Sequence, residues 1–240
     1  MTLDNTLRDA WEIGKRKCGF LVLFGLVSSI VGSLSHRSGD ANSYKALAKI
    51  LQGDMQGAKV FQEMAKNNPM TSTELILLIL SILLSVYVSL VLYRYVKKIV
   101  DDEDNINIKE LLNSSIKLYG MFFVKNLLYY VFIIVGFMLC ILPGIYIAVR
   151  LTFVPYIAAN EPELTVSETI SKSMKLTKDR FWQLFGYGIV ACLIVLAGFL
   201  LCCVGYLFTM PLAVVFMGVV YKELVNETYI PESIENNEMQ

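Results

Sequence analysis

The sequence predicts an all-α integral membrane protein in which six transmembrane helices form three helical hairpins, each preceded by an amphipathic helix on the cytoplasmic side. The first observation is composition: 55% of the 240 residues are hydrophobic and 18% are charged, whereas soluble domains carry about 25% charged residues. The second is a series of long apolar blocks, and the third is internal similarity. The net charge of zero argues against nucleic-acid binding, which needs an excess of basic residues.

The apolar blocks cover residues 18–35, 75–96, 126–142, 143–159 and 181–221. A helix needs about 20 apolar residues to cross a bilayer, so the last block holds two crossings, with a turn predicted at residues 203–206. Pro143 and Gly144 favour a reversal between the third and fourth crossings. Most Lys and Arg residues then fall on the side of the N-terminus, which places both termini in the cytoplasm.

Two stretches resemble each other at an offset of 58 residues, which aligns Ser115 with Ser173. Both begin with a capping-box pattern, at residues 107–110 and 165–168, and continue with an apolar stripe at helical spacing. The N-terminus offers a weaker third copy. The three stripes comprise Leu3, Leu7 and Trp11; Ile108, Leu112, Ile116 and Tyr119; and Val166, Ile170 and Met174.

The predicted domain is a single polytopic unit, residues 1–226, with repeats at about 2–100, 107–160 and 165–226. The first repeat contains an outer insertion, residues 36–73, which we interpret as one or two short helices. Residues 227–240 are acidic and predict a disordered tail.

The amphipathic helices have two interpretations. They lie in the headgroup plane of the inner leaflet, or they are connectors packed on the helical bundle. In the first case, the basic residues expected to contact headgroups are Lys15, Arg16, Lys17, Lys117, Lys175, Lys178 and Arg180.

Small residues predict the faces at which the helices touch, because association in a bilayer depends on close packing. Ser81, Ser85 and Ser89 form a stripe in the second crossing, Gly25 lies in the first, and Gly188 and Gly198 lie in the fifth. The serines also permit a pore lining, but no acidic ring or intramembrane His accompanies them.

No catalytic or metal-binding motif is present in the sequence. His36 is the only histidine, and the five cysteines form no CxxC pair. We therefore expect no enzymatic activity, no metal and no cofactor. Cys140, Cys202 and Cys203 lie near predicted outer turns, where a disulfide is possible, although Cys also serves as a small apolar residue.

Arg150 is a permanent cation inside the fourth apolar block. With about 1.5 Å of rise per residue, it lies roughly 10 Å below the predicted turn at Pro143. Insertion scales place the cost of such a cation at about 2.5–3.5 kcal/mol, and it normally finds a partner or a wet cavity. The apolar blocks contain no Asp or Glu, so the partner is a neutral group, a lipid phosphate or an acid from a surface helix.

Pro155 is expected to free the carbonyl of Leu151 and to kink the fourth crossing. Two interpretations of Arg150 follow. It is an internal strut satisfied by hydroxyls and carbonyls, or it is a site for an anionic headgroup or solute. The candidate lipid or solute site comprises Arg150, Pro155, Ser81, Ser85 and Ser89.

The segment "LPGIYIAVRLTFVPYIAANEPELTVSETISKSMKLTKDRFWQLFGYG" resembles a broad group of prokaryotic membrane proteins that includes the membrane domain of some glycerophosphoryl diester phosphodiesterases. The similarity covers residues 107–225 well and the first unit loosely. It implies six helices and a prokaryotic plasma membrane. It implies no activity, because the phosphodiesterase chemistry of fused relatives would lie in a soluble domain that these residues do not contain. The matching positions are Pro143, Gly144, Tyr146, Arg150, Pro155, Glu161, Ser173, Lys178, Phe181, Trp182 and Gly186.

The function expected from the sequence is therefore a non-catalytic membrane protein that engages lipid headgroups, or a membrane or cytoplasmic protein partner, through its inner amphipathic helices and Arg150. The alternative is a small transporter or lipid-translocating protein with a site between repeats.

Overall fold

The computed structural model describes residues 3–34, 72–103, 106–200 and 204–238. All regular secondary structure in these residues is α-helical. Five stretches are long and apolar enough to cross a membrane, which confirms the prediction of a helical chain with several membrane-length helices. The sixth crossing and the threefold repeat stay predictions. The five stretches are Leu75–Val100, Ile108–Leu139, Ile141–Asn160, Phe181–Leu200 and Gly205–Thr228, and a shorter apolar stretch covers Cys18–Val31.

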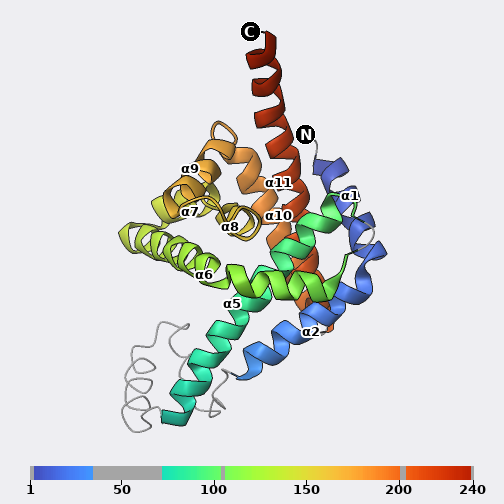
Figure 1. Cartoon of the computed structure of the whole chain (residues 1–240), viewed down its shortest axis with the longest axis vertical. Helices are drawn as coiled ribbons and strands as arrows, with labels where there is room; N and C mark the ends of the chain where they lie inside the picture. Colours follow the sequence, from blue (N-terminus) through green and yellow to red (C-terminus); the bar gives the residue numbers. More distant parts are fainter. Residues whose placement is uncertain (1–2, 35–71, 104–105, 201–203, 239–240) are drawn as a thin grey trace. The chain divides into compact units, whose positions relative to one another are not determined.

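The chain divides into two compact units, one of residues 28–85 and a larger one of residues 1–27 and 86–240. The boundaries between the units fall inside two helices, α2 and α5. Figure 1 shows the helices in chain order: α1 (Leu3–Arg16), α2 (Cys18–Leu34), α5 (Ser72–Val100), α6 (Ile108–Leu139), α7 (Ile141–Arg150), α8 (Val154–Asn160), α9 (Val166–Leu176), α10 (Phe181–Leu200) and α11 (Val204–Glu238).

The smaller unit contains two of the three serines predicted to form a contact stripe. Ser81 is buried, and its Oγ donates a hydrogen bond to the carbonyl of Leu78 at 2.8 Å. Ser85 is exposed. Nearly all of the predicted outer insertion lies outside the described residues, apart from residues 72–73 at the start of α5.

Helix α11 is the packing centre of the larger unit, and glycines let its neighbours approach closely. A methyl group on Gly25 of α2 would lie 2.9 Å from the Cα of Leu207, and one on Gly218 would lie 2.5 Å from Cγ1 of Val96 in α5. A methyl group on Gly198 of α10 would likewise clash with the side chain of Thr209 in α11. The predicted contact faces at Gly25 and Gly198 are confirmed, as expected for helices that associate through small residues.

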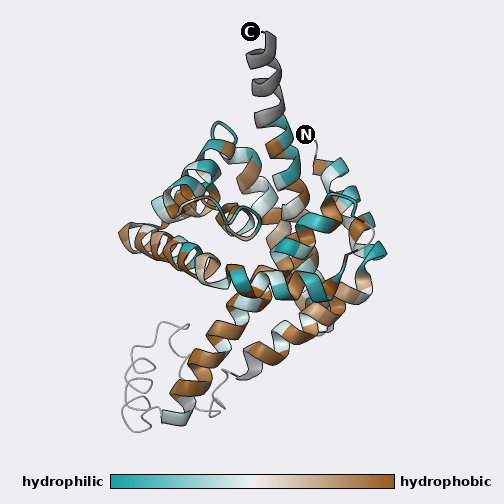
Figure 2. Ribbon diagram, viewed as in Figure 1, coloured by the Kyte–Doolittle hydropathy of each residue, from teal (hydrophilic) through white to brown (hydrophobic). Residues whose placement is uncertain are grey.

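Helix α6 is continuous from Ile108 to Leu139, so the predicted amphipathic segment and the third crossing form one helix. Its N-terminus is capped by Asn107, whose side chain accepts a hydrogen bond from the N–H of Glu110 at 3.4 Å. Figure 2 shows mixed hydropathy in the first part of α6 and almost only hydrophobic residues toward α7. The change in composition therefore occurs without a break in the backbone.

The predicted reversal at Pro143 and Gly144 is wrong by about one helical turn. The chain reverses at Cys140, which has an extended backbone, and both residues lie in the first turn of α7. Proline is tolerated there because the first N–H groups of a helix have no intrahelical partner. Gly144 allows α7 to approach α6, since a methyl group on it would lie 2.9 Å from the Cα of Phe137.

The fourth apolar block is interrupted, as Pro155 suggested, but the freed carbonyl is not that of Leu151. Helix α7 ends at Arg150 and α8 begins at Val154. The N–H of Val154 bonds to the carbonyl of Leu151 at 3.0 Å. In a continuous helix the N–H of Val154 would bond to the carbonyl of Arg150. The carbonyl of Arg150 is therefore the one that loses its helical hydrogen bond.

The turn predicted at residues 203–206 is wrong for its last three residues, since Val204, Gly205 and Tyr206 belong to α11, and residue 203 lies outside the described residues. At its other end, α11 continues to Glu238. It therefore includes most of the segment for which the sequence predicts a disordered tail.

The predicted apolar stripes are only partly covered by the protein: the Trp11 ring meets that of Phe208 in α11 and Tyr119 packs against buried residues, but other members are exposed. In α1, the small residues Thr6, Ala10 and Gly14 are buried, whereas Trp11 is 47% exposed. In α6, Ser115 is fully buried, whereas Ile116 is 62% exposed. The helices therefore use small and hydroxyl residues to contact the bundle and leave apolar side chains outward, an arrangement that suits contact with lipid.

Candidate functional site

Arg150 lies at the last position of α7 and is half-buried. Its Cζ lies 5.9 Å from the centroid of the Tyr146 ring, within the range of a cation–π interaction. Its Nε is buried and has no hydrogen-bond partner among the described residues. A buried donor without a partner costs free energy, so the guanidinium presents an unmet demand for an acceptor.

An aromatic cluster extends from the Tyr146 ring that lies beside this guanidinium. The Tyr146 ring lies 5.4 Å from that of Phe181 at the start of α10, and Phe181 lies 5.4 Å from the Trp182 ring in an edge arrangement. Tyr146 is 51% exposed and Trp182 is 79% exposed. Exposed Trp and Tyr are typical of the membrane–water interface, so the composition of the cluster resembles that of headgroup-level sites.

Hydroxyls from α9 hold the backbone of Arg150. Ser173 Oγ and Thr177 Oγ1 donate to the Arg150 carbonyl at 2.9 and 3.2 Å, and both residues are fully buried. This carbonyl is the one that the helix break releases. The hydroxyls near Arg150 therefore satisfy its backbone and leave its side chain available.

A capping box fixes the start of α9, as the sequence predicts. Thr165 Oγ1 accepts from the N–H of Glu168, and the N–H of Thr165 donates to the Glu168 carboxylate at 2.7 Å. This backbone hydrogen bond, with a second from the Thr165 hydroxyl, lowers the pKa of Glu168. The cap is consequently retained to a more acidic pH than an ordinary glutamate would allow.

The other members of the predicted site lie elsewhere. Pro155 is buried in the first turn of α8, where it shapes the backbone. Ser89 is half-buried in the larger unit, and Ser81 and Ser85 belong to the smaller unit. The proximity of this stripe to Arg150 stays a prediction.

The basic residues expected at headgroups occupy two kinds of environment. Arg16 pairs with Asp102 at 2.7 Å, and Arg180 pairs with Glu227. These acids compete with a headgroup for the same guanidinium. Lys15, Lys117, Lys175 and Lys178 are exposed and Lys17 is half-exposed, with Lys15 Nζ lying 5.1 Å from the centroid of the Trp11 ring.

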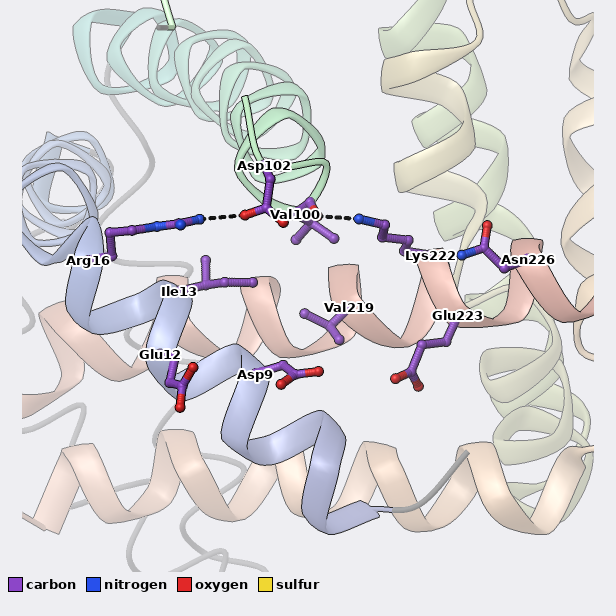
Figure 3. Close-up of a pocket in the computed structure, with 10 residues that line it drawn as sticks. All are labelled: Asp9, Glu12, Ile13, Arg16, Val100, Asp102, Val219, Lys222, Glu223 and Asn226. Atoms are coloured by element: carbon purple, nitrogen blue, oxygen red, sulfur yellow. Dashed lines mark hydrogen bonds and ion pairs between the residues drawn. The ribbon is translucent and has the colours of Figure 1, made fainter. Parts of the chain in front are cut away.

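A cleft of about 610 Å³ lies between α1 and α11, beside the end of α5. Figure 3 shows Arg16 and Asp102 joined across it, with Asp9, Glu12 and Glu223 on its other side. The hydrogen bond from Arg16 lowers the pKa of Asp102. This bond links α1 to the turn after α5.

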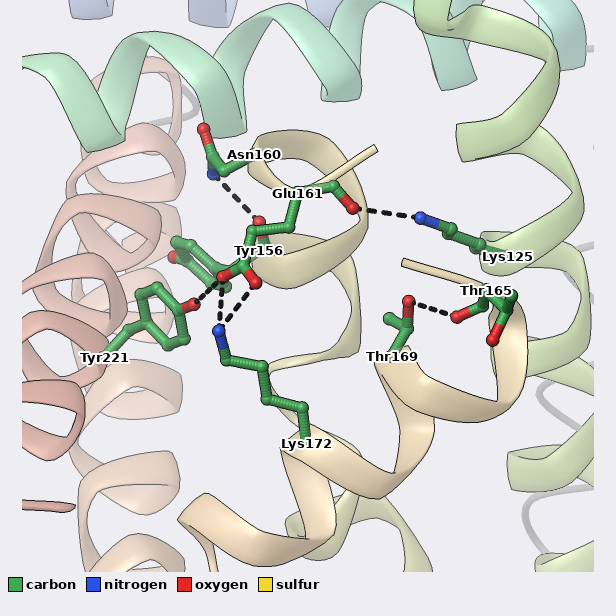
Figure 4. A network of polar contacts seen from close by, with 8 residues as sticks. All are labelled: Lys125, Tyr156, Asn160, Glu161, Thr165, Thr169, Lys172 and Tyr221. Carbon is green, nitrogen blue, oxygen red and sulfur yellow. Dashed lines mark hydrogen bonds and ion pairs between the residues drawn. The ribbon is translucent and has the colours of Figure 1, made fainter. Parts of the chain in front are cut away.

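A polar network connects α6, α8, α9 and α11 around Glu161, which the sequence indicates only as a position of the resemblance. Figure 4 shows Lys172 and Tyr221 converging on its carboxylate. Lys172 Nζ donates at 2.6 and 2.7 Å, and the Tyr221 hydroxyl donates at 3.1 Å. Lys125 is 2% exposed and donates to the carbonyls of Glu161 and Pro162 at 3.1 and 3.4 Å.

Replacing Glu161 with Gln should destabilise the larger unit by about 1 kcal/mol. The variant keeps the size of the side chain but removes a charge-assisted interaction of about 1.5–3 kcal/mol, reduced because Glu161 and Lys172 are 30% and 22% exposed. Thermal unfolding in detergent would measure the loss. Glu163→Gln is the matched control because Glu163 is exposed, and an equal effect of both variants would contradict a structural role for the network.

The fold and this site define a class: a helical protein whose described residues include five stretches long and apolar enough to cross a membrane, and which has a cation–aromatic site at the junction of α7, α9 and α10. No protein-family model matches the chain, and no curated protein or solved structure matches it either. The resemblance described above stays a prediction.

Sequence reasoning found Arg150 but missed its partners. Tyr146 and Phe181 lie 35 residues apart in sequence, and no periodic pattern predicts that their rings meet. The sequence indicates Ser173 only as the aligned counterpart of Ser115 and as a position of the resemblance. The spacing of Thr169, Ser173 and Thr177, four residues apart, places three hydroxyl groups on one face of a helix and could have indicated this contact face.

Proposed function

We propose that this chain is a non-catalytic membrane protein that engages anionic lipid headgroups through the region around Arg150, with further contacts from basic residues of its cytoplasmic-side helices. The observation that carries the proposal is the buried Arg150 Nε, which has no hydrogen-bond partner among the described residues. A lipid phosphate supplies the oxygen acceptors and the negative charge that a guanidinium prefers.

A comparison with Arg94 supports this proposal. Arg94 is also an arginine within an apolar helix, but its Nη1 donates to Ser114 Oγ at 2.9 Å and to Ser115 Oγ at 3.0 Å. Arg94 is therefore an internal strut that joins α5 to α6. The guanidinium of Arg150 lies beside the Tyr146 ring, and its buried Nε has no hydrogen-bond partner among the described residues, which leaves that nitrogen open to an acceptor from a lipid.

The surroundings of Arg150 also favour a lipid. Exposed Trp182 and Tyr146 provide amphipathic rings at the level of headgroups. Lys178 lies in the turn between α9 and α10 and is exposed, and each basic residue near an anionic surface contributes about 1 kcal/mol. A cation, interfacial rings and a nearby lysine together match an anionic phospholipid.

The test compares lipid binding by the purified full chain and by Arg150→Gln and Arg150→Leu. Native mass spectrometry of the delipidated protein titrated with phosphatidylglycerol should show about tenfold weaker binding for both variants, because a charged hydrogen bond is worth about 1.5–3 kcal/mol. Thermal stability should stay within about 0.5 kcal/mol of the parent. Phosphatidylcholine should bind more weakly than phosphatidylglycerol to the parent.

Arg94→Gln is the matched control for this experiment. It should lower thermal stability, because it removes two hydroxyl contacts, and should leave phosphatidylglycerol binding unchanged. If Arg150→Gln instead lost stability and kept its lipid affinity, Arg150 would be a strut and the proposal would be wrong.

A further inference from the structure

The hairpin of α6 and α7 projects an apolar surface that little of the described chain covers. Met138 is 82% exposed, Leu139 is 73% exposed and Leu142 is 78% exposed, all beside the reversal at Cys140. The sequence contains no acidic or basic residue between Lys125 and Arg150. An exposed apolar surface of this kind marks contact with lipid or with a partner.

Both ends of this hairpin are held by hydrogen bonds to neighbouring polar groups. On α6, Lys125 donates to the carbonyls that follow α8. On α7, the carbonyl of Arg150 accepts from two hydroxyls of α9. The polar groups that meet at Glu161 include Lys172 of α9, so α9 links the two attachments.

The position of Tyr146 sets the depth of the hairpin. Its ring lies 5.4 Å from Phe181, the first residue of α10, which directly follows Lys178, Asp179 and Arg180. Tyr146 therefore lies at the charged end of α10. If α7 crossed the bilayer outward to Cys140, Tyr146, six residues from Cys140, would lie roughly 20 Å from Phe181 along that 20-residue helix.

The length of α7 agrees with a shallow position. Helix α7 has 10 residues, which span about 15 Å at 1.5 Å per residue. The hydrocarbon core of a bilayer is about 30 Å thick. Starting from headgroup depth, α7 reaches only to the middle of the membrane. Figure 1 shows α6 and α7 running together across the direction of α11.

We propose that the α6–α7 hairpin is re-entrant: it enters the membrane from the cytoplasmic side, ends near the bilayer midplane at Cys140, and uses its exposed apolar surface to contact the acyl chains of that single leaflet. The pattern of charge fits this occupant. Lys125 and Arg150 lie at the base of the hairpin, and only apolar residues lie at its tip. The backbone of the tip is helical on both sides of Cys140, which limits the unsatisfied polar groups in hydrocarbon.

This hairpin replaces the third and fourth crossings that the sequence predicts. Arg150 then lies at the depth of the phosphates and not in the centre of the bilayer, which removes most of the cost of an intramembrane cation. Both termini remain on the same side, because a re-entrant hairpin and a pair of crossings return the chain to the same surface.

The test measures the depth of residue 140 in the full chain. Cys18, Cys192, Cys202 and Cys203 are replaced with Ala, a nitroxide spin label is attached to Cys140, and the protein is reconstituted into vesicles of phosphatidylcholine and phosphatidylglycerol. Collisions with oxygen, which concentrates in hydrocarbon, should be frequent, and collisions with a water-soluble nickel chelate should be rare. Leu142→Cys in a Cys140→Ala background should give the same result and guards against a perturbation specific to residue 140.

Two reference labels calibrate the experiment, Ser167→Cys at the exposed start of α9 and Leu200→Cys at the far end of α10. Frequent nickel collisions at residue 140, as for Ser167→Cys, would show a crossing that reaches water and would overturn the proposal. Rare collisions with both reagents would show that a second copy or another protein covers the tip, and would also overturn it. Lipid binding by Arg150 has a separate readout, so failure of either proposal is recognised independently of the other.

Discussion

Gly25→Ala should lower the free energy of unfolding by about 3 kcal/mol. The methyl group would lie 2.7 Å from the carbonyl carbon of Leu207 and 2.9 Å from its Cα, and these backbone atoms cannot rotate away. Helix α2 would have to separate from α11 along its whole contact. Overpacking of a tight interface costs about 1–3 kcal/mol, and this position belongs at the upper end because the obstacle is backbone.

Gly19→Ala is the matched control for this variant. Gly19 lies in the same helix, six residues earlier, and a methyl group on it would meet nothing within 4 Å. Alanine is the better helix former by about 1 kcal/mol, so this control should be neutral or slightly stabilising. Unfolding in mixed detergent and sodium dodecyl sulfate, monitored by circular dichroism, would measure the free energy of unfolding of both variants. Equal stability of the two variants would contradict the close packing of α2 on α11.

Gly198→Ala should produce the second large loss, about 2 kcal/mol. Its methyl group would lie 2.7 Å from Cγ2 and 2.8 Å from Cβ of Thr209. Rotation of the threonine side chain moves Cγ2 but leaves Cβ in place, and threonine is stiff at χ1. Helices α10 and α11 must therefore shift apart, at a cost typical of an overpacked core.

The matched control for Gly198→Ala lies in the same helix, α10. Gly188 is exposed and has open space around its Cα, so Gly188→Ala should leave stability unchanged or raise it by up to about 1 kcal/mol. A double variant, Gly198→Ala with Thr209→Ala, should recover part of the lost stability by removing both Oγ1, the threonine atom nearest the new methyl group, and Cγ2. No recovery, together with a full loss in the single variant, would indicate that the contact with Thr209 is not the cause.

The sequence predicts which segments are helical in a membrane, because length and composition decide that question locally. It also predicts Gly25 and Gly198 as contact residues. It does not distinguish them from Gly188, which belongs to the same pattern in α10 but faces open space. Which side of a helix meets a neighbour depends on tertiary contacts, and a pattern of small residues does not determine it.

The turns and the site also show that local sequence predicts a feature but not its exact position, which depends on tertiary contacts. Pro155 predicts a break in the fourth apolar block, but the released carbonyl is that of Arg150 because the helix ends one turn before the proline. Pro143 and Gly144 predict a reversal, yet the chain turns at Cys140 and uses Gly144 for close approach to Phe137. The apolar stripe containing Trp11 is only partly covered, because in α1 the small residues form the buried contact and Trp11 meets α11 only through Phe208.

Arg150 was identified from one local fact, a cation in an apolar block. The sequence places it roughly 10 Å below an outer turn, on the assumption that each apolar block crosses the bilayer completely, whereas the proposed re-entrant hairpin places it at headgroup depth. The contact between Tyr146 and Phe181 carries that proposal, and it connects two helices that no local rule relates. The buried network around Lys125 and Glu161 depends on such long-range contacts for the same reason.

The most direct test of this account is an experimental structure of the full chain in phosphatidylglycerol-containing nanodiscs. We predict density for a lipid phosphate about 3 Å from Arg150 Nε, with the Trp182 and Tyr146 rings at the same depth. A protein carboxylate or carbonyl bonded to that nitrogen, with no lipid beside it, would contradict the account.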